Sequence, residues 1–184
     1  GTSGKPQKID TPLEASVVRA LYTGDVKGAL EALSKTTPDR RARRVAKKLM
    51  KYVGTTKLFL VDPSNDNPAS MTAGEAANLS KLFAKERNGE LPAGLYVGAD
   101  NAILLNQRTG INAYTFLHEM AHAATLFEIE TNPQSATVKR LNKLYEDVKA
   151  TYGEYKPYGT TNLAEFVAEA YSNPEFQRDL ARIN

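Results

Sequence analysis

Residues 113–129 combine a long apolar run with a narrow polar stripe, and this segment constrains the fold more than any other. Five polar side chains interrupt it before its last turn, and at about 100° per residue of α-helix they fall within an arc of roughly 120°. They are Thr115, His118, Glu119, His122 and Thr125. A helix that is apolar on its remaining faces must be buried. We therefore expect a buried helix whose stripe faces a polar cleft, a metal ion or both.

The middle of this stripe, residues 118–122, reads His-Glu-Met-Ala-His, which is the HExxH pattern. In a helix, imidazoles four residues apart project from one face and can converge on one ion. Glu119 lies to one side, where it can accept a proton from a metal-bound water without binding the ion. The alternative is two core histidines satisfied by hydrogen bonds. The shared stripe favours a catalytic zinc site with His118 and His122 as ligands.

The residue type of the third metal ligand follows by elimination. The chain has two histidines and no cysteine, so neither a further imidazole nor a thiolate is available. A carboxylate remains, as in the class of catalytic zinc sites with two histidines and a glutamate. A second apolar helix, expected over residues 163–171, carries Glu165 and Glu169 one turn apart. One of them could bind the ion while the other accepts a hydrogen bond from a ligand imidazole.

Glu165 has an alternative role at the start of its helix. Asn162 is a good N-cap residue, and a glutamate three residues later is the usual partner in a capping box. Because the proposed metal site still lacks one carboxylate, we favour the role of Glu165 as a ligand.

The rest of the chain predicts an α+β fold. Short apolar segments bounded by turn residues predict strands at 58–61, 95–97 and 102–105, the last two forming a hairpin. Helical periodicity and capping signals predict several further helices. We expect a small, mostly antiparallel sheet packed with several helices.

Two blocks of the sequence resemble the catalytic domain of the anthrax lethal factor-like zinc peptidases. One is the HExxH pattern, and the other, residues 158–170, reads Tyr-Gly-Thr-Thr-Asn-Leu-Ala-Glu-Phe-Val-Ala-Glu-Ala. Relatives of that family occur in bacterial toxins and in large phage-encoded proteins. The resemblance covers the order and spacing of both blocks and is weak over the N-terminal third. It implies that zinc is bound by His118, His122 and Glu165.

The resemblance also implies roles for three residues that do not bind the ion. Glu119 would be the general base, and Tyr158 would donate a hydrogen bond to the tetrahedral oxyanion. Glu169 would be an acid that supports a ligand imidazole. Only the assignment of Tyr158 depends on the resemblance alone, and a loop tyrosine without a role is its alternative.

These observations predict three regions in the chain. Residues 1–8 are expected to be a cloning remnant or disordered, 9–54 to be a helical N-terminal extension, and 55–184 to be a zincin-like metallopeptidase domain. The chain is expected to be a fragment of a larger polypeptide. A secreted toxin or a component of a phage particle would fit the resemblance, although the sequence itself indicates no compartment.

The function expected from these features is that of a zinc-dependent endopeptidase acting on a protein or peptide. Ala102, Ile103 and Leu104 are expected to form an edge strand that pairs with an extended substrate; ordinary core sheet is the alternative. Two other functions remain open at this point. The site could process only its parent polypeptide, or zinc could stabilise a module for binding or assembly, although such a module has no need of Glu119.

Charge and hydropathy bear on other partners. A net charge of +3 is a weak argument for binding nucleic acid. Residues 40–51 form a basic helix that could bind phosphates, or it could be a solvated face whose apolar stripe packs on the core. Its cations are Arg40, Arg41, Arg43, Arg44, Lys47, Lys48 and Lys51. We favour the solvated face. No apolar run approaches the ~18 residues of a membrane span.

Overall fold

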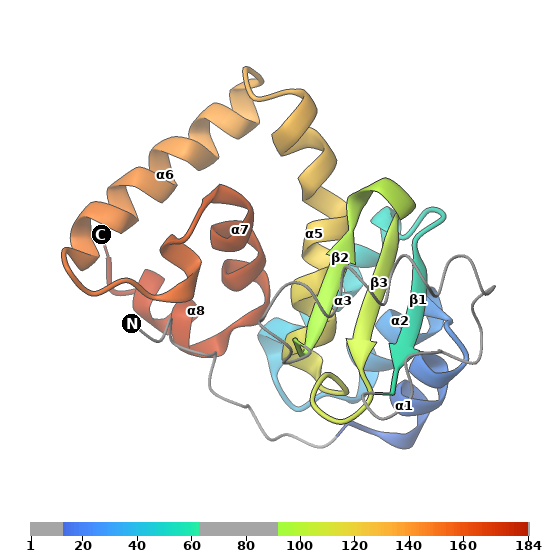
Figure 1. The fold of residues 1–184 in the computed structure, drawn as a ribbon. Coiled ribbons are helices and arrows are strands. Elements are labelled where there is room, and N and C mark those ends of the chain that lie inside the picture. Colours follow the sequence, from blue (N-terminus) through green and yellow to red (C-terminus); the bar gives the residue numbers. More distant parts are fainter. Residues whose placement is uncertain (1–12, 63–91, 184) are drawn as a thin grey trace.

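The computed structural model describes residues 13–62 and 92–183, which form seven α-helices and a three-stranded sheet (Figure 1). The helices are α1 (Ala15–Tyr22), α2 (Val26–Thr36), α3 (Arg40–Leu49), α5 (Ala113–Thr131), α6 (Ala136–Tyr152), α7 (Leu163–Ser172) and α8 (Pro174–Leu180). The strands are β1 (Lys57–Val61), β2 (Gly94–Val97) and β3 (Ala102–Asn106). The α+β class expected from the sequence is confirmed.

The sheet is mixed, in the order β1-β3-β2, and not mostly antiparallel as expected. Strands β2 and β3 form the expected antiparallel hairpin, and Asn101 closes its turn in the left-handed region at φ 45°. Strand β1 pairs with β3 in parallel, with Lys57 opposite Ala102. A parallel pair needs a long crossover, and the chain between β1 and β3 is long enough to provide one.

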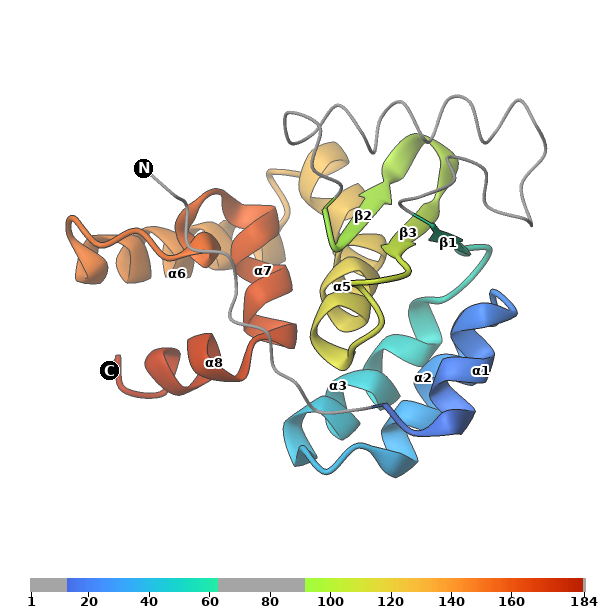
Figure 2. The ribbon, with the colours of Figure 1, turned by 60° about the horizontal axis from the view of Figure 1, so that its bottom comes forward.

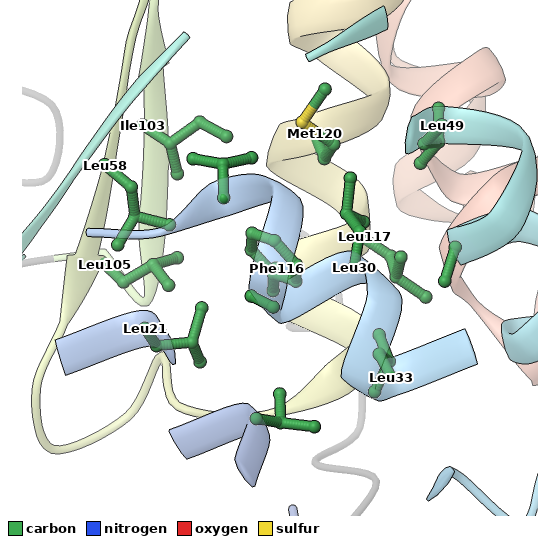
Figure 3. Close-up of a cluster of buried hydrophobic side chains, with 14 residues drawn as sticks. Leu21, Leu30, Leu33, Leu49, Leu58, Ile103, Leu105, Phe116, Leu117 and Met120 are labelled. Carbon is green, nitrogen blue, oxygen red and sulfur yellow. The ribbon is translucent and has the colours of Figure 1, made fainter. Parts of the chain in front are cut away.

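The main hydrophobic core lies where α1, α2 and α3 meet the sheet and α5. Figure 2 shows these three helices side by side beneath α5 and the sheet. Figure 3 shows the buried side chains that the helices share with β1, β3 and α5. Those labelled are Leu21, Leu30, Leu33, Leu49, Leu58, Ile103, Leu105, Phe116, Leu117 and Met120. The N-terminal helices therefore belong to the same packed unit as the sheet and α5.

A second hydrophobic cluster is built by α6, α7 and α8. Its buried members are Val138, Tyr145, Val148, Leu163, Phe166, Val167 and Phe176. Figures 1 and 2 place α5 between these helices and the sheet, and α7 packs directly against α5. The contact between α5 and α7 thus lies between the two clusters.

The basic helix α3 packs on the core by its apolar stripe, with Ala46 and Leu49 buried. Six basic side chains of α3 and of the turn that follows it are exposed. They are Arg40, Arg41, Arg44, Lys47, Lys48 and Lys51. This is the arrangement expected of a solvated helical face. Among the described residues, no helix is both long enough and apolar enough to cross a membrane.

Candidate metal centre

The polar stripe of α5 is buried, as the sequence predicts. The helix is capped by Asn112, whose side chain accepts a hydrogen bond of 2.8 Å from the backbone N–H of Thr115. His118, Glu119 and His122 follow on the buried part of the helix, each less than a tenth exposed. Thr125 is half-buried and donates to the carbonyl of Ala121, so it takes no part in the cluster described below.

Helix α7 brings Glu165 to the two histidines. One carboxylate oxygen, Oε2, lies 3.0 Å from Nε2 of His118, and the other, Oε1, lies 3.0 Å from Nε2 of His122. Asn162 caps α7 through the backbone N–H of Glu165 at 2.8 Å. Because Glu165 is fixed at the cap by its backbone, its carboxylate is left to point at α5.

His118, His122 and Glu165 form a buried group that could hold a metal ion. The Nε2 atoms of the two imidazoles point at each other at 3.1 Å, as expected of ligands sharing one ion. Nδ1 of His122 is buried without a hydrogen-bond partner among the described residues, so this ring is held through Nε2 alone.

Glu169 lies behind His118 and is 1% exposed. Its Oε1 is 3.0 Å from Nδ1 of His118, on the side of the ring opposite Glu165. In a neutral ring that donates its Nδ1 proton to Glu169, Nε2 of His118 carries the lone pair that a metal ion would bind. This is the tautomer that a metal ligand needs.

The charges around His118 have opposing effects on its pKa. Burial lowers the pKa of the ring, but hydrogen bonds to Glu165 and Glu169, together with the charge of Glu119, raise it to about 10. Burial likewise raises the pKa of Glu165, but hydrogen bonds and charge interactions with both histidines hold it well below its usual range. The two neighbouring carboxylates therefore stabilise the protonated form of the His118 ring.

The side chain of Glu119 packs closely against strand β2. Its carboxylate accepts a hydrogen bond from the backbone N–H of Tyr96. A Cβ added at Gly94 would lie 2.9 Å from Cγ of Glu119 and 2.7 Å from the Thr115 methyl group, so only glycine allows this approach. Burial raises the pKa of Glu119, and the nearby charges of His118 and His122 oppose that rise. A carboxyl group placed in this way is suited to accepting a proton near neutral pH.

Tyr158 also lies beside the candidate ligands. It begins a single 3-10 turn (Tyr158–Thr160) that packs on α7, and its ring centroid is 6.0 Å from that of His118. The structure therefore brings together all the residues to which the sequence assigned metal binding or catalysis, from α5, α7 and this turn.

The expected substrate strand is wrong. Ala102, Ile103 and Leu104 are fully buried in β3, the central strand, whose two edges are occupied by β1 and β2. A strand with both edges paired cannot pair with a peptide. The short apolar run of β3 carried no signal that would distinguish a central strand from an edge strand.

Two residues near His118 were missed from the sequence. Tyr114 donates a hydrogen bond to Oε1 of Glu169, and Asn173 donates to Oε2 at 2.7 Å. Tyr114 was counted as part of the apolar face, although it stands one turn before His118. Asn173 reads as the N-cap of α8, which it also is.

Comparison of the chain with protein-family models, with curated proteins and with solved structures found no match.

Proposed function

We propose that the protein is a zinc-dependent endopeptidase with the ligands His118, His122 and Glu165. The observation that carries this proposal is the convergence of these three side chains beside a fourth, Glu119, on the same helix as the histidines. Ligands about 2.0–2.1 Å from a tetrahedral zinc lie roughly 3.3 Å from one another. The separations of 3.0–3.1 Å between the facing atoms are close to that value.

Membership of the lethal factor-like zinc peptidases is part of the proposal. Its support is the sequence resemblance together with the proximity of Tyr158 and Glu169 to His118. A module in which zinc serves only stability would have no need of a buried carboxylate beside the metal. Glu119 therefore favours the enzyme over such a module.

In this function each residue has a distinct task. A bound zinc would polarise the scissile carbonyl and lower the pKa of a bound water. Glu119 accepts a proton from the attacking water and returns it to the leaving amine, held in place by the N–H of Tyr96. Tyr158 donates a hydrogen bond to the oxyanion that develops on the carbonyl.

The test is digestion of an untargeted peptide library by the purified protein loaded with zinc. Cleavage that stops with a chelator and returns with zinc would support the proposal. Cleavage that is unaffected by chelation would contradict it.

His122→Ala is expected to yield largely metal-free protein, whereas the parent chain binds about one zinc per molecule. The variant leaves a single imidazole and one carboxylate, which cannot complete a zinc shell. Metal analysis after dialysis against buffered zinc measures the difference. Thr125→Ala, one turn further along α5, is the matched control and should keep the metal. Equal zinc content in His122→Ala and the parent would contradict the site.

Zinc binding at neutral pH is expected to release a proton from His118. The pKa of His118 is about 10, so the ring is protonated below that pH. A metal ligand must be neutral, so binding displaces this proton, and this group alone should raise the apparent affinity about tenfold per pH unit on moving from pH 6 to 9. Calorimetry in buffers of different ionisation enthalpy counts the protons released. Binding heats that do not depend on the buffer would contradict this prediction.

A further inference from the structure

Tyr114 and Glu169 form a buried contact that the proposed reaction does not use directly. Tyr114 lies in the first turn of α5, one turn before His118, and its ring centroid is 5.8 Å from that of His118. Its hydroxyl donates to Oε1 of Glu169. That same oxygen lies 3.0 Å from Nδ1 of His118. One carboxylate oxygen thus serves both a ring proton of a candidate ligand and the phenol of its neighbour on the helix.

The other oxygen of Glu169 is held as well. Asn173 donates to Oε2 from Nδ2 at 2.7 Å, while its own Oδ1 accepts from the backbone N–H groups of Glu175 and Phe176 as the N-cap of α8. Glu169 is 1% exposed, so protein groups and not bulk water must meet its hydrogen-bonding needs. Both oxygens are therefore held by uncharged donors from separate helices.

Other groups near Nδ1 of His118 do not replace this contact. The hydroxyl of Ser172 is 3.5 Å from Nδ1, but it donates to the carbonyl of Ala168 at 2.6 Å. Glu169 is the closer partner of the ring. The orientation of His118 therefore depends on where the Glu169 carboxylate is held.

We propose that Tyr114 is a positioning residue of the metal centre, which holds Oε1 of Glu169 so that Nε2 of His118 points at the metal position. This inference rests on the proposed function in one respect, that the centre binds zinc. Tyr114 does not touch the metal or a substrate, and it acts through Glu169. Partners of this kind orient the ligand ring, and their loss usually weakens metal binding by about 10–100-fold.

The test compares Tyr114→Phe with Tyr152→Phe. Each change removes a phenolic hydroxyl that donates to a carboxylate, and Tyr152 donates to Asp179 at 3.2 Å in the second hydrophobic cluster, away from the histidines. Tyr114→Phe should bind zinc roughly tenfold more weakly, at the low end of the range for outer partners. It should also shift the visible absorption of the cobalt-substituted protein, which reports ligand geometry. Tyr152→Phe should change neither.

A double-mutant cycle shows whether Tyr114 acts through Glu169. Glu169→Ala alone should weaken zinc binding by about 10–100-fold. With that carboxylate gone, Tyr114 has nothing to position, so adding Tyr114→Phe should cost almost nothing further. Additive losses would show that Tyr114 acts by another route and would overturn the inference.

The inference and the proposed function can fail separately. If the parent protein binds zinc and Tyr114→Phe weakens it, but no peptide is cleaved, the positioning role stands and the peptidase does not. If Tyr114→Phe binds zinc with the parent's affinity and cobalt spectrum, the positioning role is wrong whatever the activity. A parent protein that binds no zinc overturns both.

Discussion

Glu119→Gln is expected to retain zinc and to lose peptide hydrolysis by about two to four orders of magnitude. The amide has almost the shape of the carboxylate and can still accept the hydrogen bond from Tyr96. It cannot take a proton from the attacking water. The first-order rate of cleavage of any peptide identified in the library digest, measured at equal zinc content, gives the effect.

Glu130→Gln is the matched control for this change. Glu130 lies on the same helix but is exposed and outside the candidate metal group. The same loss of one negative charge from α5 should leave the rate almost unchanged. If Glu119→Gln cleaved as fast as the parent, Glu119 would not be the base. A variant that lost its zinc would instead show a structural role for the carboxylate at β2.

Glu165→Ala is expected to lose more zinc affinity than the roughly 10–100-fold that removal of an outer partner costs. The carboxylate is 3.0 Å from Nε2 of both histidines and is the only side chain described here that joins them from a second helix. The capping alternative predicts a different result, a stability loss of about 0.5–2 kcal/mol with metal binding intact. Zinc affinity and melting temperature, measured on the same samples, distinguish the two.

Glu175→Ala provides the comparison for this variant. Glu175 lies in the first turn of α8, and its N–H donates to the N-cap Asn173 just as the N–H of Glu165 donates to Asn162. Its side chain is exposed and is not part of the candidate metal group. It should lose a few tenths of a kcal/mol through the helix dipole and keep the affinity for zinc. A larger loss of affinity in Glu169→Ala than in Glu165→Ala would mean that the two glutamates have exchanged roles.

The candidate centre could be predicted from the sequence because its residues follow helical spacing. His118 and His122 share a face by geometry alone, and Glu165 stood out as a polar side chain on an apolar helix near an N-cap. The capping box and the metal ligand looked like competing roles. In the structure the backbone N–H of Glu165 donates to the N-cap Asn162, while its carboxylate lies beside the histidines. The N-cap hydrogen bond and the candidate ligand role therefore use different groups of the same residue.

The order of strands could not be predicted in the same way, because it depends on contacts between distant segments. The apolar runs of β1 and β3 look alike, and only their pairing shows that β3 is central. The sequence likewise could not show whether the N-terminal helices pack against the rest of the chain or form a separate extension. Residues such as Leu30 and Phe116 lie far apart in sequence yet share one core. Tyr114 was missed because a tyrosine on an apolar helix reads as core packing until its partner is known.

The site's dependence on two helices from different hydrophobic clusters has a consequence for when it can act. The histidines lie on α5 and Glu165 on α7, with the whole of α6 between them in the chain. A chain emerging from the ribosome presents both imidazoles well before the carboxylate that completes the set. If the proposed function is correct, hydrolysis would then wait until α7 has been made and has docked on α5. Under that proposal each molecule would be inactive as a peptidase during its own synthesis, when neighbouring unfolded segments would be most easily cut.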